Sequence, residues 1–187
     1  SIFLREEIKV QGASRTDSGV HAFGQKACFK AKELSDPKKL LAGLNALLPR
    51  DIGVNFIQEV PENFHPIREA KAKIYRYTLW LGRCYNPFVF PYVWSVPQSV
   101  DIKTLEKAIR SFEGTHDFSS FCNTDTSVKT KVRTILETKV VIRRNSVDLW
   151  FLGEGFLKQM IRIIVGTLVD FSLRKNLETS IDKVLEE

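Results

Sequence analysis

The chain is poor in cysteine and histidine, and it contains no long apolar run. Its 187 residues include three cysteines, and no two of them form a Cys-x-x-Cys pair. An odd number without such pairs argues against a disulfide framework and favours a reducing compartment, the cytoplasm. We expect neither a signal peptide nor a membrane span. The three histidines lack the spacing of a zinc site or a facial triad, so we expect no metal.

The composition that remains is globular and basic. Hydrophobic residues make up 43% of the chain, which is enough to bury a core as one large domain or two small halves. Lys and Arg number 28 against 22 Asp and Glu, so the net charge at pH 7 is +6. This balance favours anionic partners, although many basic proteins bind no nucleic acid.

The segment Gly12–Ala22, GASRTDSGVHA, places Asp17 between an arginine, two glycines and a histidine. Apolar residues flank it on both sides, which predicts a strand, a tight loop and a second strand. Glycines let the backbone pass close to a ligand. Arg15 and Asp17 are two residues apart, so an extended backbone would point both to one side, where the guanidinium could pair with the carboxylate or with a substrate phosphate. We therefore expect an ionised Asp17 at a functional site.

Two other interpretations of this segment stay open. An Asp in a glycine-flanked turn commonly hydrogen-bonds its own backbone, and that structural role is the more frequent one. Asp17-Ser18-Gly19 also has the form found in aspartic proteases, which use two carboxylates that share one proton. The nearest second copy, Asp125-Thr126-Ser127, lacks the glycine. An aspartic-type hydrolase would therefore need a homodimer to supply the second carboxylate.

Two further groups of residues could act on a ligand. Tyr75 and Tyr77 share one face of a predicted strand, where aromatic rings beside basic residues suit either stacked bases or an ordinary core. Lys158 and Arg162 lie four residues apart and share a face of a predicted helix. Such basic side chains can have no ligand and simply extend their charged ends to water while their apolar stems pack on the protein. We favour this interpretation for Lys158 but not for Arg162.

The pattern of the chain predicts alternating helices and strands. We expect helices over 38–48, with Asp36 as N-cap and Pro37 at the first position, from Asp101 to near Gly114, and over 156–173. We expect strands over 52–60 and 70–81, and a hairpin of 132–143 with 147–153. His116 and Asp117 form either an acid/base pair or, in better agreement with their neighbours, a cap on a turn.

These elements indicate an α+β fold of two pseudo-symmetric halves, each with a mostly antiparallel sheet flanked by helices. We place the first half at residues 1–86 with the Asp17 loop, a connector at 87–100, and the second half at 101–187. A catalytic cleft between the halves would set the Asp17 loop opposite the last helix.

Four blocks of the sequence resemble, in order, the motifs of one family. Gly12–Ala22 is similar to that family's GAGRTDAGVHA signature, and the other blocks are Ala72–Tyr77, Asp117–Phe121 and Phe156–Gly166. The chain thus resembles the tRNA pseudouridine synthase A family over nearly its whole length. Ser14 stands where the family usually has Gly, and Ser18 where it usually has Ala. Neither departure touches the presumed chemistry.

The resemblance implies an isomerase that converts uridine to pseudouridine at positions 38, 39 and 40 of the tRNA anticodon arm. It implies that Asp17 is catalytic, and that the substrate is bound by Arg15, His21, Tyr75, Lys158 and Arg162. Arg15 would fill the place of the extruded base, Tyr75 would stack on the uracil, and Arg162 would pair with Asp17. Whether Asp17 attacks or deprotonates stays open. The resemblance also implies no cofactor, since substrate and product are isomers, and a homodimer that shares one tRNA.

The family carries a further N-terminal strand and helix with Y-x-G and G-W-Q motifs, and neither motif occurs in this chain. We therefore expect a fragment that lacks this strand and helix and the extreme C-terminus. A non-catalytic RNA-binding fragment stays open as an alternative, beside the aspartic-type hydrolase.

Overall fold

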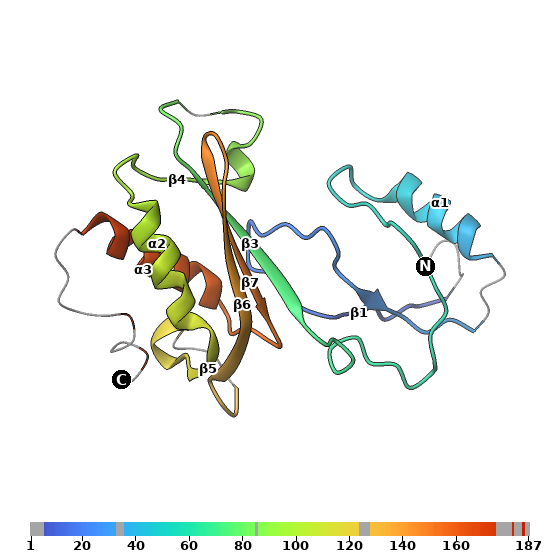
Figure 1. The fold of residues 1–187 in the computed structure, drawn as a ribbon. Helices are drawn as coiled ribbons and strands as arrows, with labels where there is room; N and C mark the ends of the chain where they lie inside the picture. Colours follow the sequence, from blue (N-terminus) through green and yellow to red (C-terminus); the bar gives the residue numbers. More distant parts are fainter. Residues whose placement is uncertain are drawn as a thin grey trace. The chain divides into compact units, whose positions relative to one another are not determined.

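The computed structural model describes residues 6–32, 36–84, 86–123, 128–174, 181 and 185. The chain forms two compact units (Figure 1). The first unit comprises Ser1–Arg15 and Ala22–Ala70, and the second comprises Thr16–His21 and Lys71–Glu187. The Asp17 loop therefore belongs to the second unit, although the chain on both sides of it belongs to the first. The predicted halves, 1–86 and 101–187 with a connector, are a different division and stay a prediction.

The first unit contains a short ribbon and one helix. Strand β1 (Gln11–Gly12) pairs with β2 (Ala27–Cys28) in antiparallel fashion, so the strand, loop and strand predicted around the motif are present in short form. Helix α1 (Pro37–Leu47) begins as predicted, because the Asp36 carboxylate accepts hydrogen bonds from the backbone N–H groups of Lys38 and Lys39 at 2.9 and 3.2 Å.

The strand predicted over residues 52–60 is wrong. Among the described residues no strand pairs with that segment, and part of its backbone is hydrogen-bonded by a side chain instead. The Asn45 amide donates to the Val54 carbonyl at 2.9 Å, and its carbonyl oxygen accepts from the Val54 N–H at 2.7 Å. The alternating apolar residues therefore mark an extended segment that is held by α1.

The second unit is built on a five-stranded sheet of order β4-β3-β7-β6-β5. Its strands are β3 (Lys73–Trp80), β4 (Trp94–Ser95), β5 (Gly114–Asp117), β6 (Val132–Ile142) and β7 (Ser146–Gly153). All neighbours are antiparallel except β3 and β4, which are parallel. The predicted α+β class is confirmed, as is the hairpin, which is now formed by β6 and β7.

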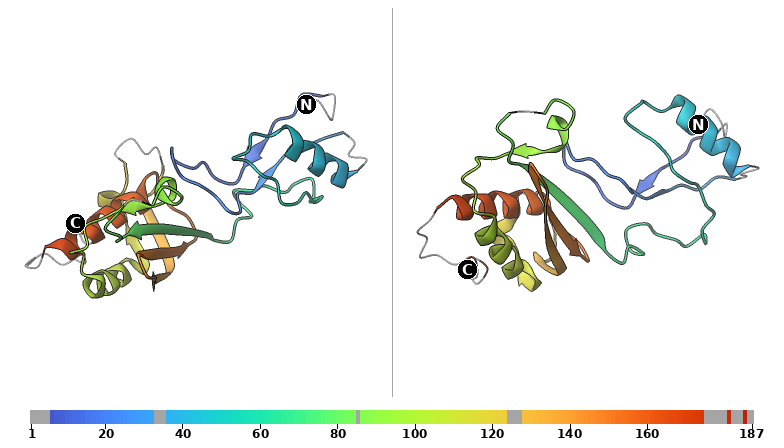
Figure 2. Two further views of the ribbon diagram at one scale, coloured as in Figure 1. Left: turned by 90° about the horizontal axis from the view of Figure 1, so that it is seen from above. Right: turned by 45° about the horizontal axis from the view of Figure 1, so that its top comes forward.

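Two helices lie on one side of this sheet, α2 (Ile102–Ala108) and α3 (Met160–Leu173), as both views in Figure 2 show. Strand residues alternate between the two faces, so Leu79, Leu149 and Phe151 point toward these helices and are fully buried. Ile164 and Leu168 of α3 meet them and are also fully buried. This core is the largest in the described chain, and it fixes β3 and α3 relative to one another.

Helix α3 begins later than the apolar pattern predicts. Gln159 has a left-handed backbone with φ of 60°, which ends the preceding turn and sets the first helical residue at Met160. Lys158 therefore lies outside the helix, and the predicted helical face shared by Lys158 and Arg162 is wrong. The apolar pattern begins at Phe156, before the break at Gln159, and that break is visible only in the backbone geometry.

Gly153 at the end of β7 is packed too closely to carry a side chain. An added Cβ would lie 2.8 Å from the Thr134 carbonyl oxygen and 2.9 Å from Cζ of Phe156. We expect Gly153→Ala to lower the free energy of unfolding by about 1–3 kcal/mol, because β6 or Phe156 must shift. Urea denaturation measures this loss. Gly155→Ala is the matched control, since its Cβ would meet only Arg133 at 4.0 Å. Equal midpoints for the two variants would contradict the prediction.

Candidate active site

The Asp17 loop is closed by its own backbone. The Val20 N–H donates to the Asp17 carbonyl at 3.1 Å, and Gly19 within this turn has φ of 75°, a conformation that strains any residue with a Cβ. Asp17 itself is half-buried. The glycine in the motif is therefore required by the turn that presents the carboxylate.

Arg162, in the first turn of α3, holds this loop. Its Nη2 donates a hydrogen bond to the Ser18 carbonyl at 2.5 Å, across 144 residues of sequence. In the part of the chain that the structure describes, this carbonyl is the partner of the guanidinium, which contacts the residue next to Asp17 and not the carboxylate itself. The structure thus brings Asp17 and Arg162 to one place, and their direct pairing stays a prediction.

Tyr75 and Tyr77 project from β3 on the side of the sheet that α3 covers, and both are half-buried. The Tyr75 ring meets the edge of Phe156 with centroids 4.9 Å apart, and the Tyr77 ring meets Trp94 at 6.3 Å. Burial raises the pKa of Tyr77 above its ordinary value of 10.0, while the positive charge of Arg162 acts in the opposite direction. The Tyr77 hydroxyl is therefore neutral at physiological pH and lies within the field of Arg162.

His21, at the other end of the motif, is exposed and packs on an aromatic ring. Its centroid lies 4.5 Å from that of Tyr92, with the ring planes tilted by 59°. Tyr92 ends a 3-10 turn, Phe90–Tyr92, that precedes β4. The motif loop is thus bordered by Arg162 on one side and by this turn on the other.

The two remaining predicted residues, Arg15 and Lys158, are both exposed. Arg15 ends the first segment of the first unit, one residue before the loop passes to the second unit. The expected pairing of Arg15 with Asp17 stays a prediction for that reason. The Lys158 carbonyl accepts from the Asn123 N–H at 3.3 Å, which anchors the backbone just before α3.

Asp117 takes a capping role. Its carboxylate accepts from the Ser119 N–H at 2.8 Å and from the Ser119 hydroxyl at 2.6 Å, which fixes the 3-10 turn Ser119–Phe121. The flanking Phe118 and Phe121 are fully buried. Of the two interpretations of His116 and Asp117, the cap is confirmed.

These bonds make Asp117 a source of pH-dependent stability. The Ser119 hydroxyl, followed by the Ser119 N–H, holds the pKa of Asp117 below its ordinary value of 3.8. A lowered pKa in the folded state means stability that is present above the unfolded pKa and is lost as the pH falls through the folded one, so the loss lies below about pH 4. We expect Ser119→Ala to raise the pKa of Asp117, measured by NMR titration. Ser120→Ala is the control, and an unchanged or lower value in Ser119→Ala would count against this account.

Three further expectations concern a second protease-like carboxylate, a metal ion and a membrane span. Asp125-Thr126-Ser127 lies outside the described residues. Within the described ranges, no three His, Cys, Asp or Glu side chains gather where they could hold a metal ion. A search of the same residues finds no helix with the length and apolarity to cross a membrane.

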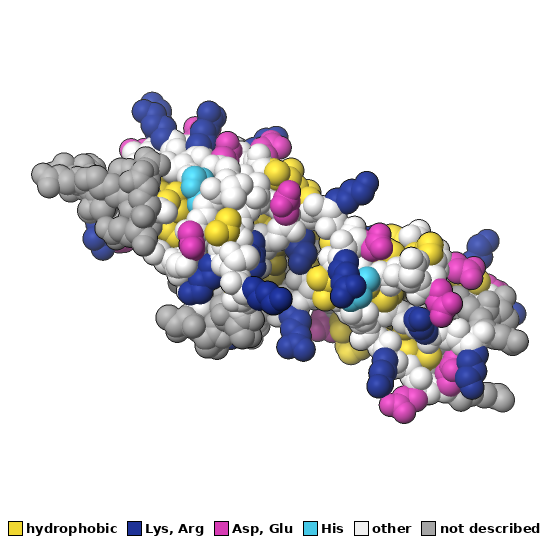
Figure 3. Space-filling model, turned by 90° about the horizontal axis from the view of Figure 1, so that it is seen from below, with side chains coloured by type: hydrophobic (Ala, Val, Ile, Leu, Met, Phe, Trp, Pro, Cys, Tyr) yellow, Lys and Arg dark blue, Asp and Glu magenta, His cyan; other side chains and the backbone are white. Residues whose placement is uncertain are grey.

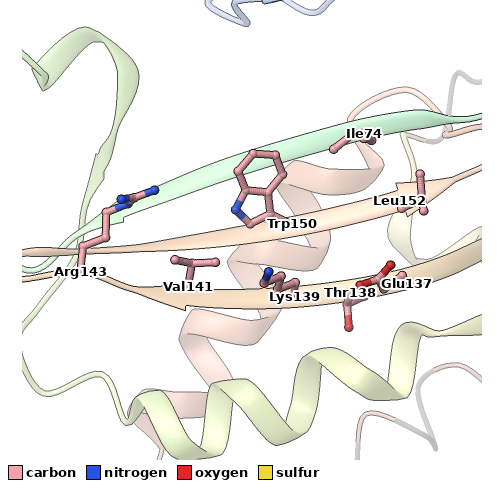
Figure 4. A pocket seen from close by; sticks show the side chains of 8 residues that line it. All are labelled: Ile74, Glu137, Thr138, Lys139, Val141, Arg143, Trp150 and Leu152. Atoms are coloured by element: carbon pink, nitrogen blue, oxygen red, sulfur yellow. The ribbon is translucent and has the colours of Figure 1, made fainter.

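An open hollow lies on the other face of the sheet, away from Asp17 (Figure 4). Ile74, Trp150 and Leu152 supply its apolar surface, with Lys139 and Arg143 along β6 and beyond its end. The Trp150 indole N–H is buried without a hydrogen-bond partner. Asp17 does not line this hollow, so we place the candidate active site at the motif loop.

The chain carries more basic than acidic side chains. On the face drawn in Figure 3, Lys and Arg side chains are exposed together with Asp and Glu side chains. The net charge of +6 favours an anionic partner.

Comparison with known proteins gives the class of this protein first. The profile of a family described as "tRNA pseudouridine synthase" matches residues 108–187, which include most of the sheet and α3. A chain with a pseudouridine synthase profile thus has a mostly antiparallel sheet and an aspartate loop that is held by Arg162 of α3.

Curated relatives narrow this class. A tRNA pseudouridine synthase A of Bacillus licheniformis is 41% identical over 181 residues, covering 97% of this chain and 73% of the relative. One of Anoxybacillus flavithermus is 39% identical over 180 residues, covering 96% and 73%. One of Aquifex aeolicus is 34% identical over 186 residues, covering 100% and 77%. The chain belongs to the tRNA pseudouridine synthase A family, a family of isomerases.

The sequence interpretation missed two contributions to the site. Tyr77 lies close to Arg162, whereas we expected only Tyr75 to act there. The turn that carries Tyr92 borders His21, although its segment reads as a connector in the sequence. The alternation of aromatic residues at 88, 90, 92 and 94 was the available signal, because a plain linker rarely repeats large rings.

Proposed function

We propose that this protein isomerises uridine to pseudouridine in tRNA, at positions 38, 39 and 40 of the anticodon arm. One observation carries the proposal: the motif aspartate lies on a turn whose Ser18 carbonyl accepts a hydrogen bond from Arg162, and the charge of Arg162 acts on Tyr77 of β3. The names of the relatives, tRNA pseudouridine synthase A, support tRNA as the substrate. The basic net charge suits a polyanion.

The reaction exchanges one bond of the base for another. The N1–C1′ glycosidic bond breaks, the uracil turns, C5 joins C1′, and the proton on C5 leaves to solvent while N1 gains one. A uridine stacked in a stem must first leave the helix, at a cost of a few kcal/mol, before a side chain can reach it. No electron or group is added, so the proposal requires no cofactor.

In this mechanism Asp17 is the catalytic residue and Tyr75 stacks on the uracil. Asp17 acts either as a nucleophile on the ring or sugar or as a base that removes a sugar proton, and both routes need an ionised carboxylate. Arg162 keeps the loop, and with it the carboxylate, in place. Arg15 fills the position that the extruded base vacates, and His21 and Lys158 contact the surrounding backbone of the RNA.

We further propose that two copies of the chain share one tRNA and that the protein acts in the cytoplasm. The dimer follows from the family resemblance. The cytoplasm suits Cys28, Cys84 and Cys122, all of which are free thiols in the structure.

Release of tritium from uracil C5 tests the proposal, because the proton on C5 leaves only when C5 joins the sugar. We expect release from an anticodon stem-loop labelled at position 38, 39 or 40, and none from the same hairpin labelled only in the lower stem. Tight, salt-sensitive binding without release would support the non-catalytic RNA-binding alternative and contradict the proposed reaction.

A further inference from the structure

We propose that the aromatic segment Phe88–Trp94 is a stacking platform for unpaired bases next to the nucleotide that reacts. This inference rests on the proposed function, since it concerns the same RNA at the same site. The segment leads into β4, the edge strand of the sheet, and its last residue, Trp94, is the first residue of that strand (Figure 1). Its four rings come at every second residue: Phe88, Phe90, Tyr92 and Trp94.

These rings are unusually exposed for large aromatic side chains. Phe88 exposes 88% of its surface, Tyr92 60% and Trp94 39%. A large exposed aromatic surface on a soluble protein marks a contact with a ligand or partner more often than chance allows. Tyr and Trp also combine a flat apolar face with a polar edge, which suits a partner that is itself flat and hydrogen-bonding.

The backbone of the aromatic segment is fixed before any ligand arrives. The Phe88 N–H donates to the Asn86 carboxamide oxygen at 3.1 Å, and the Tyr92 N–H donates to the Val89 carbonyl at 2.8 Å. Trp94 then enters β4, which pairs with β3 at Leu79. The rings are therefore presented by a preformed turn, so little conformational entropy is lost when a base stacks on them.

The platform is continuous with the candidate active site. Tyr92 packs on His21, the last charged or polar residue of the motif, with centroids 4.5 Å apart. Trp94 packs on Tyr77, and Tyr77 lies in the field of Arg162, which holds the Asp17 loop. Two of the four rings are thus joined by contacts to the residues that surround the Asp17 loop.

The chemistry of the surroundings favours RNA bases over a protein or lipid partner. Every base has a π-face, so stacking on aromatic rings does not depend on the base sequence. An enzyme that acts at three adjacent positions needs this tolerance, because the neighbouring bases differ from one position to the next. The cationic neighbour Arg162 attracts a phosphate backbone and would oppose the burial expected in an apolar protein interface. A second copy of this chain is the competing occupant.

A double-mutant cycle between protein and RNA tests the platform. The probes are an anticodon stem-loop RNA and the same hairpin with abasic loop nucleotides beside the target uridine, which keep the phosphates but remove the π-faces. In an Asp17→Asn background, which separates binding from turnover, we expect Tyr92→Ala to weaken binding of the intact hairpin roughly tenfold. The abasic hairpin should lose almost nothing, and Tyr92→Phe should bind as the parent does.

Ile142→Ala is the control, since Ile142 is as exposed as Tyr92, at 62%, but lies on β6. Equal losses for both hairpins, or no loss, would overturn the platform. A change of oligomeric state in Tyr92→Ala, seen by sedimentation without RNA, would assign the rings to a second copy and overturn it too. Tritium release by the parent protein is measured separately. If release were absent while Tyr92→Ala still weakened binding of the intact hairpin alone, the proposed reaction would be refuted and the stacking platform would be supported.

Discussion

Asp17→Asn is expected to abolish tritium release from labelled tRNA, with a loss of about 10³-fold or more in turnover. The substitution keeps the shape of the side chain and removes its charge. Both chemical routes need the carboxylate, as the atom that attacks or as the base that accepts a proton. The turn should persist, because the Asp17 backbone carbonyl, not its side chain, accepts from Val20. Binding of tRNA should therefore change little while turnover disappears.

Asp51→Asn is the matched control for this experiment. Asp51 is an exposed carboxylate of the first unit, and its replacement removes the same charge from the protein. Turnover should then stay at the parent level. If Asp17→Asn released tritium as fast as Asp51→Asn, Asp17 would have no catalytic role.

Arg162→Met is expected to lower turnover by about 10–100-fold, since it removes a charge-assisted hydrogen bond to the Ser18 carbonyl. In the proposed mechanism Arg162 is a positioning residue, because it contacts the loop that carries Asp17. The same substitution should raise the pKa of Tyr77 further, because the charge that opposes the effect of burial is gone. Ultraviolet titration of tyrosinate measures that shift alongside the rate.

Arg162→Lys separates positioning from simple loss of structure. It keeps the positive charge near Tyr77 but not the reach and geometry of the guanidinium. We expect the pKa of Tyr77 to stay close to that of the parent while turnover recovers only in part. Full turnover in Arg162→Met would show that the Ser18 contact does not hold the catalytic geometry.

Local patterns made the second unit predictable. The β6–β7 hairpin follows from two alternating runs around a polar turn, and α2 follows from the capping Asp101, whose carboxylate accepts from the Lys103 N–H at 3.0 Å. The motif itself was visible because glycine, aspartate and arginine are rarely crowded together without a chemical reason.

Tertiary partners decided what the sequence could not show. Residues 52–60 have the alternation of a strand, but Asn45 satisfies Val54 where a neighbouring strand would. Gln159 gives no local sign that its backbone is left-handed, so the start of α3 was placed too early. The contact of Arg162 with a carbonyl, and the approach of Tyr92 to His21, join segments far apart in the chain.

The passage of Thr16–His21 into the second unit has a consequence for local opening. In these six residues the Ser18 carbonyl accepts from Arg162 of α3, and His21 packs on Tyr92. The chain on either side of them belongs to a unit whose described core includes few buried apolar side chains, Ala13 and Leu40 among them. Amide hydrogen exchange in β1 and β2 should thus follow the opening of the first unit. The Val20 amide should exchange more slowly, at a rate set by the opening of the second unit. A protease that cleaves the first unit would therefore leave the Asp17 turn in contact with α3.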